Sequence, residues 1–190
     1  VDRLLARGLY DEVGAPNLYF AGGPDTVGIV WRVTERPNPN RLAVVLGLSR
    51  RDGQGATRVS GSVDLRLPNL AGVGRALAVN WSDDGAQRSR FGFAYLEPLA
   101  FGTPLDVAAD LESEVQRDSY TRLRLDLVLR LPVVSLWWVE LGAGWDRTTY
   151  PTGETERTVR RRARGAFGHK RGDFAQSGWS GLFALETAHR

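Results

Sequence analysis

The sequence predicts an all-β fold: an antiparallel meander of about nine strands that forms part of a transmembrane β-barrel. Three observations support this prediction. Apolar and polar side chains alternate with a period of two, turn-forming segments separate the alternating runs, and charged side chains stand in the middle of the runs. Because successive side chains of a strand point to opposite faces, each run predicts a strand with one apolar and one polar face.

The clearest run covers residues 120–131, where a leucine stands at every odd position from 123 to 131. The even positions between them hold mainly arginine and aspartate. A helical period of 3.6 residues would scatter the leucines over both sides of a helix, so the pattern predicts a strand. Eight further runs are found at residues 42–48, 59–67, 77–81, 91–95, 105–111, 137–145 and 179–187, with a weaker one at 158–167.

The segments between the runs are short and rich in Gly, Pro, Asn and Asp, which are the residues that turns favour. They are R-D-G-Q-G at 51–55, P-N-L-A-G-V-G at 68–74, D-D-G at 83–85, F-G-T-P at 101–104, P-V-V-S at 132–135 and P-T-G-E at 151–154. Joins of this length cannot make the crossovers that parallel strands need, so the predicted topology is an antiparallel meander. Its odd strand number predicts an incomplete barrel, and therefore a piece of a longer protein.

Each run has two sets of alternating positions, one apolar and one polar, which we call its apolar and polar parity. We expect the apolar parity to face lipid and the polar parity to face a water-filled interior. Several runs approach the roughly 9–11 residues that a tilted membrane strand needs, and the mid-strand charges of mixed sign suit a wet lumen. Trp137 and Trp145 bound one apolar run, as aromatic girdles do. The predicted lipid-facing residues are Leu123, Leu125, Leu127, Leu129, Trp137, Val139, Leu141 and Trp145. The alternative is a soluble barrel or sandwich, in which the same residues form an ordinary core.

The first 36 residues predict a different organisation. Apolar residues at helical spacing within residues 1–7, followed by Gly8, predict the end of a helix. Strands are expected at 17–21 and 27–35, and R-P-N-P-N at 36–40 is a linker because prolines interrupt a strand ladder. The predicted domains are residues 1–36, a linker at 37–40 and the barrel segment at 41–190.

Composition excludes several functional classes. The 190 residues contain no Cys and only two His, so we expect no metal site of the usual Cys or His type and no cofactor. Nucleophile-elbow, zinc-protease, Walker and dinucleotide-binding motifs are absent from the sequence, so we expect no enzyme. The net charge of +3 is mostly interleaved, apart from an arginine-rich segment at 157–171, so we expect no nucleic-acid binding. In that segment Arg161 shares the alternate positions of the apolar residues, so we expect either that it lies near a membrane interface or that this strand is not a membrane strand.

Several segments together resemble the BamA/TamA superfamily of outer-membrane assembly and secretion pores, also described as the bacterial surface-antigen family. They are R-G-L-Y-D-E-V at 7–13, I-V-W-R-V-T-E-R-P at 29–37, residues 42–49, N-L-A-G-V-G-R at 69–75, Y-L-E-P-L-A-F-G-T-P at 95–104 and G-D-F-A-Q-S-G-W at 172–179. The combination of the turn at 69–74 with the corner at 95–104 is the more specific part. The family's V-R-G-F type of loop, which lies later in the barrel, does not occur here.

The resemblance implies that residues 1–36 end an α/β POTRA domain in the periplasm and that residues 41–190 begin a barrel in the bacterial outer membrane. It implies a non-enzymatic pore that inserts or translocates polypeptides by strand addition at a lateral seam. The implied seam residues are Leu42, Val44, Leu46, Gly47 and Leu48, and the implied periplasmic turn residues are Asn69, Gly72, Gly74, Pro98, Gly102 and Pro104. The implied partners are outer-membrane lipid, lipopolysaccharide, client polypeptides and accessory assembly proteins. Two alternatives remain: a passive porin or structural barrel, and a soluble lipid-binding barrel.

Overall fold

A computed structural model describes residues 10–20, 26–37, 40–50, 57–134, 137–151, 157–170 and 178–189. By its internal contacts the chain divides into two units, Val1–Asn38 and Pro39–Arg190. The identities predicted for these two parts of the chain stay predictions. The helix predicted at residues 1–7 lies outside the described residues.

The described part of the first unit consists of short strands in two antiparallel pairs. These are β1 (Tyr10–Val13), β2 (Asn17–Phe20), β3 (Val27–Val30) and β4 (Val33–Glu35); β1 pairs with β4, and β2 pairs with β3. The prediction of a single strand at 27–35 is wrong. The segment forms two strands, β3 and β4, which pair with different partners and are separated by Trp31 and Arg32. The Gly14 N–H donates to the Arg32 carbonyl at this break, with a distance of 2.9 Å.

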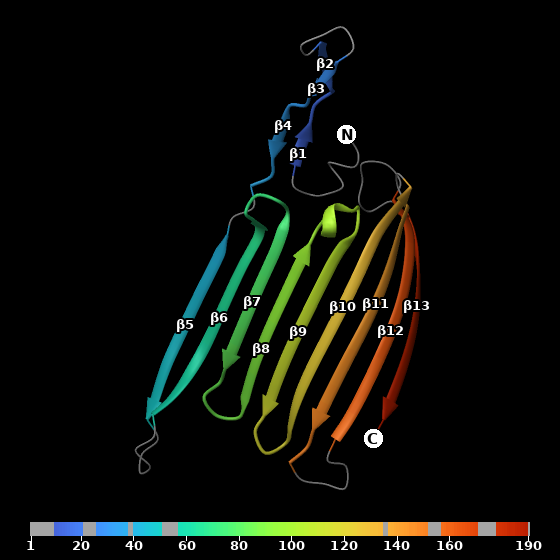
Figure 1. Cartoon of the computed structure of the whole chain (residues 1–190). Helices are drawn as coiled ribbons and strands as arrows, with labels where there is room; N and C mark the ends of the chain where they lie inside the picture. The colour runs from blue at the N-terminus through green and yellow to red at the C-terminus, as the bar shows by residue number, and fades with distance from the viewer. Residues whose placement is uncertain are drawn as a thin grey trace. The chain divides into compact units, whose positions relative to one another are not determined.

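The described part of the second unit is a nine-stranded antiparallel sheet in which each strand pairs with the next along the chain (Figure 1). The strands are β5 (Arg41–Arg50), β6 (Thr57–Leu70), β7 (Arg75–Asp83), β8 (Arg88–Glu97), β9 (Asp106–Gln116), β10 (Tyr120–Val134), β11 (Trp137–Thr149), β12 (Arg157–Lys170) and β13 (Gly178–His189). A short 3₁₀ turn, η1 (Ala100–Gly102), joins β8 to β9. The predicted meander of nine strands is confirmed, and within the described residues β5 and β13 form its two edges.

Two predicted strand limits are wrong. A turn is predicted at 132–135, but residues 132–134 belong to β10, which ends at Val134. A register shift between Pro132 and Val134 accommodates the N–H that proline lacks. Trp145 does not end its strand, since β11 runs on to Thr149. The turn predicted at 51–55 lies outside the described residues.

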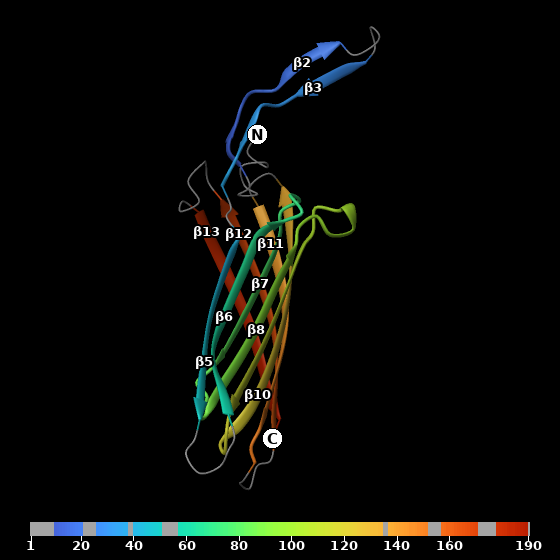
Figure 2. The same ribbon diagram turned by 90° about the vertical axis from the view of Figure 1, so that its left-hand side faces the viewer.

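The register places the two parities on separate faces of the sheet across all nine strands. On one face, Leu125 of β10 lies opposite Leu111 of β9 and Trp145 of β11. On the other face, Asp126 lies opposite Asp110 and Gly144. We call these the apolar face and the charged face. Figure 2 shows the sheet turned by 90° and reveals its curvature.

Burial in this fold is the reverse of that in a water-soluble globule. Leu125, Leu127 and Val139 are 45%, 46% and 38% exposed, so they do not form a buried core. The described residues include two buried charged side chains on the sheet, Glu140 and Asp146. Apolar side chains that remain exposed over a whole sheet face need a nonaqueous neighbour, because their contact with water is unfavourable.

Candidate functional site: the charged face and the β5 edge

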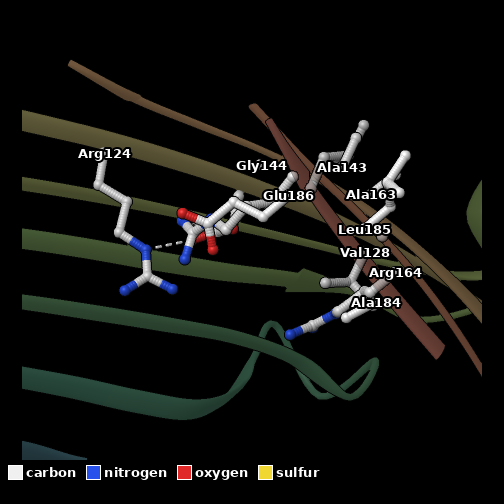
Figure 3. Close-up of a pocket in the computed structure, with 13 residues that line it drawn as sticks. Arg124, Val128, Ala143, Gly144, Ala163, Arg164, Ala184, Leu185 and Glu186 are labelled. Carbon is white, nitrogen blue, oxygen red and sulfur yellow. Dashed lines mark hydrogen bonds and ion pairs between the residues drawn. The ribbon is translucent and has the colours of Figure 1, made fainter. Parts of the chain in front are cut away.

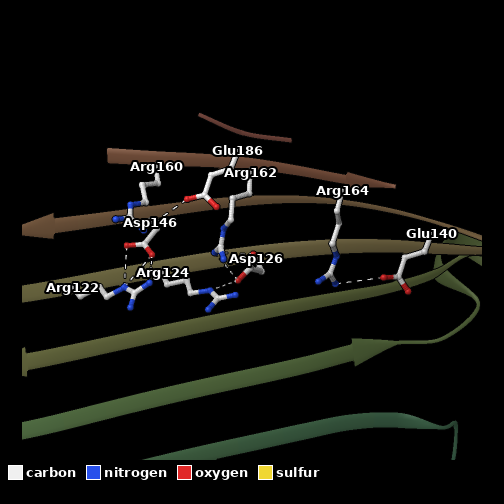
Figure 4. Close-up of polar contacts among 9 residues, drawn as sticks. All are labelled: Arg122, Arg124, Asp126, Glu140, Asp146, Arg160, Arg162, Arg164 and Glu186. Carbon is white, nitrogen blue, oxygen red and sulfur yellow. Dashed lines mark hydrogen bonds and ion pairs between the residues drawn. The ribbon is translucent and has the colours of Figure 1, made fainter. Parts of the chain in front are cut away.

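Ion pairs join the strands of the charged face between β10 and β13 (Figure 4). Glu140 accepts from Arg130 at 2.6 Å and lies 3.5 Å from the guanidinium of Arg164 on the next strand. Asp146 pairs with Arg122 and is 3% exposed. Because these carboxylates are buried and paired, each links its own strand to a neighbour through side chains as well as through the backbone ladder.

The network also spans two strands. Asp126 of β10 lies 2.6 Å from Arg124 and 3.3 Å from Arg162 of β12, so this contact passes over β11. Two glycines of β11 leave space for the network. A methyl group at Gly144 would lie 2.4 Å from Asp126 Oδ1, and a methyl group at Gly142 would lie 2.7 Å from Arg164 Cγ. Side chains at these two positions would therefore crowd the charged residues of the neighbouring strands.

The same region is hollowed on the charged face. A hollow of about 110 Å³ lies over β10 to β13, with Arg124, Gly144 and Glu186 in its lining (Figure 3). A hollow, together with a contact between alternate strands, is expected on the concave side of a curved sheet, where side chains converge. The charged face is therefore the inner face, and the apolar face is the convex one.

Most of the described basic side chains of the arginine-rich segment form ion pairs with carboxylates on nearby strands. Arg160 lies 3.8 Å from Glu186, while Arg162 and Arg164 pair with carboxylates on β10 and β11. Arg161 lies on the apolar face opposite Trp145, as its parity predicts, four residues from the start of β12. Arg160, Arg162 and Arg164 therefore contribute to cross-strand ion pairs rather than to a free anion-binding surface.

The predicted seam residues all lie on β5. Leu42, Val44, Leu46 and Leu48 are on the apolar face and are exposed. One side of β5 pairs with β6 from Arg41–Arg66 to Arg50–Thr57, and the other side has no strand partner among the described residues. A row of backbone donors and acceptors is therefore available for pairing along this edge.

Gly47 and Gly61 mark a close approach between β5 and β6. The Ser60 hydroxyl donates to the Gly47 carbonyl at 3.4 Å. Gly61 has a φ of 153°, and a methyl group there would lie 2.1 Å from the Val45 carbonyl oxygen. Gly61 also forms the last pair between β6 and β7, opposite Asp83. Gly61 is not among the residues predicted from the sequence; a glycine inside an alternating run is the signal that could have identified it.

The predicted periplasmic turn residues lie at one end of the sheet, where β5 begins (Figure 1). The Gly74 N–H donates to Asn69 Oδ1 at 2.7 Å, and Gly72 and Gly74 have φ values of 72° and 80°. These values are in the left-handed region that glycine adopts without strain. Pro98, Gly102 and Pro104 lie in the corner between β8 and β9. Their periplasmic location stays a prediction.

The predicted lipid-facing residues share the convex face, and six of them are exposed: Leu125, Leu127, Leu129, Trp137, Val139 and Leu141. Leu123 and Trp145 are half-buried by their neighbours. Within the described ranges, no helix is both long enough and apolar enough to cross a membrane. The described side chains also form no cluster suited to a metal ion.

No protein-family model matches the sequence, and no curated protein matches it. Among solved structures, the crystal structure of BamA from Haemophilus ducreyi lacking POTRA domains 1–3 matches with a TM-score of 0.46 and 16% sequence identity. The match covers 96% of this chain and 41% of the other. The chain therefore spans less than half the length of that structure.

Proposed function

We propose that this chain contributes the first strands of an outer-membrane β-barrel that inserts or translocates polypeptides, acting by strand addition at β5 and without a catalytic step. The observation that carries the proposal is the β5 edge. Ten residues present their backbone along a sheet edge, next to an apolar face that continues across the whole sheet. An incoming strand of a client polypeptide would pair with this backbone and continue both faces.

The two faces support a membrane location for the sheet. The convex face offers exposed leucines to acyl chains, and the concave face holds paired charges that remain compatible with water. Backbone groups in lipid must all be paired, so an edge such as β5 needs a partner strand there. A seam strand and a client strand would alternate as that partner. Lipopolysaccharide and accessory assembly proteins are further proposed partners at the membrane surface.

Site-directed crosslinking tests the proposal. A cysteine at Val44 or Leu46 of the full-length protein should form an adduct with a nascent barrel protein. A cysteine at Leu127, on the same face but in the middle of the sheet, serves as the matched control and should give none. An absence of adducts at both edge positions with every barrel client tried would contradict strand addition.

A passive porin is the second candidate, and the paired charges of the concave face favour it, because they suit a water-filled channel. The porin interpretation predicts ion conductance in planar bilayers together with no client adduct at β5. The two candidates are therefore separated by the same crosslinking variants.

A further inference from the structure

The corner between β8 and β9 exposes two large apolar side chains in an unusual backbone conformation. Phe101 is 93% exposed and Leu99 is 50% exposed. Their φ values are 58° and 53°, in the left-handed region that residues other than glycine rarely adopt. A polar residue such as Asn would tolerate this conformation better and would also suit water. Leu99 and Phe101 are therefore better suited to contact with an apolar environment than to contact with water.

Internal bonds fix the corner firmly. The Ala100 N–H donates to the Leu105 carbonyl at 2.7 Å, and the Leu99 N–H donates to Asp106 Oδ1 at 3.1 Å. The Thr103 hydroxyl donates to the Ala100 carbonyl at 2.7 Å, and Ala100 itself is 3% exposed. The exposed pair is therefore held in place by a bonded turn.

A polar cluster at the ends of β7 and β8 marks where the apolar face stops. Arg75 Nε lies 2.8 Å from Glu97 Oε2, and the Tyr95 hydroxyl also donates to Glu97. These residues share the parity of the apolar face, since Tyr95 pairs with Leu77. An ion pair is costly within hydrocarbon, and tyrosine favours the membrane–water boundary, so the cluster places that boundary at this end of the strands.

The corner follows Glu97 directly, and Figure 2 shows it projecting out of the sheet on the convex side. Leu99 and Phe101 thus lie just beyond the polar cluster, on the side that carries the lipid-facing leucines. From this geometry we propose that the corner is a membrane anchor, in which Phe101 and Leu99 insert into the headgroup and acyl boundary of the lipid leaflet. This inference rests on the proposed membrane location of the sheet.

Insertion would fix the vertical position of the sheet in the bilayer. Apolar side chains at the boundary resist displacement toward water, while the Arg75–Glu97 pair resists displacement toward hydrocarbon. The two features oppose each other within one corner. The corner joins β8 and β9, the third and fourth strands after β5 in the sheet order, so it can hold the sheet in place while the edge exchanges partners.

Labelling with an environment-sensitive fluorophore tests the anchor. The 190 residues contain no cysteine, so each variant places one new label site within them. Phe101→Cys and Leu99→Cys report on the corner, Leu125→Cys reports on the strand face, and Ala71→Cys is the matched control. Ala71 is exposed, lies in the turn at the same end, and has a φ of 59°. The labelled full-length protein is reconstituted in vesicles of phosphatidylethanolamine and phosphatidylglycerol.

We expect nitroxide-labelled lipids to quench the label at 101 strongly, and iodide on both sides of the bilayer to quench it several-fold more slowly than the label at 71. Equal iodide quenching at 101 and 71 would overturn the anchor. Shielding of 101 from both quenchers would indicate a protein neighbour and would also overturn it. If nitroxide-labelled lipids quench the label at 125 but not the label at 101, the anchor is rejected and the membrane location stands. If they quench neither label, the membrane location is rejected as well.

Discussion

The β5–β6 edge and the β10–β12 region use the same antiparallel ladder but differ in what the side chains add to it. Between β5 and β6, the described cross-strand polar contacts are an Arg41–Asp64 pair at 3.8 Å and the Ser60–Gly47 bond at 3.4 Å. From β10 to β12, the buried carboxylates of Glu140 and Asp146 link successive strands, and the half-buried Asp126 links β10 to β12. Separation of β5 from its neighbour therefore breaks mainly backbone bonds, whereas separation of strands in the middle of the sheet also leaves charges unpaired.

This difference fits a strand that exchanges partners. At the free side of β5, an incoming strand needs to supply only backbone bonds, which do not depend on sequence. It cannot easily replace a paired buried carboxylate, whose loss leaves an opposite charge without a partner. The following variants test this contrast, beginning with the largest expected effect.

Replacement of Gly61 should have the largest effect. In Gly61→Val the new side chain would clash with the Val45 carbonyl oxygen and adopt an unfavourable φ, so we expect a loss of about 3 kcal/mol in the free energy of unfolding. Urea unfolding from vesicles measures it. Gly72→Ala is the control, because its φ of 72° is also positive but nothing lies within 4 Å; it should lose about 1 kcal/mol. Equal losses would show that the close approach at the edge is unimportant.

Removal of a buried carboxylate should have the next largest effect. Asp146→Ala leaves Arg122 without its partner, and because Arg122 is partly exposed to solvent we expect a loss of about 2 kcal/mol. In the matched variant Glu186→Ala, an exposed pair at 3.8 Å is removed, and the loss should stay below about 0.5 kcal/mol. The same unfolding measurement compares them. A similar loss for both would mean that burial does not strengthen the network.

A smaller effect is expected at Gly144. The methyl group of Gly144→Ala would displace Asp126 from Arg162, and we expect a loss of about 1 kcal/mol. A double-mutant cycle with Asp126→Ala provides the test, because the alanine at 144 should cost nothing once the carboxylate is absent. A cost that persists in the Asp126→Ala background would assign the effect to the backbone of β11.

The smallest effect concerns the turn between β7 and β8. Backbone N–H groups of Arg88, Ala86 and Gln87 donate to Asp84 and lower the pKa of its carboxyl group. Because the folded-state pKa is lowered, the stabilisation is present above the ordinary pKa of aspartate and is lost as the pH falls through the folded-state value. The stability advantage over Asp84→Ala should therefore shrink at acidic pH. Asp84→Asn keeps the acceptor oxygen without the charge, so its own advantage over Asp84→Ala should not change across this range.

The nine strands of the sheet could be predicted because a period of two is a local property of the sequence. Leucines at alternate positions from 123 to 131 identify β10 and its two faces without knowledge of any neighbour. β1 could not be predicted in the same way, because four residues are too few to show a period. The position of Pro132 within β10 could not be predicted either, because a strand tolerates proline there only through a register shift against β11.

The candidate site was predictable in part for the same reason. The parity of Leu42, Val44, Leu46 and Leu48 places them on one face of β5, and the structure agrees. Their role as a seam depends on β5 being an edge, which is a property of the sheet as a whole. Gly61 was missed because its constraint is the position of the Val45 carbonyl on another strand.

Residue type and spacing alone establish which side chains are apolar, how they alternate and where most of the turns lie. The residue pairs across neighbouring strands and the identity of the concave face become known only in the folded sheet, because they depend on register and curvature. Asp126 and Arg162 are 36 residues apart in the chain and meet over a glycine of a third strand. Such contacts arise only once the sheet has brought three strands into one alignment.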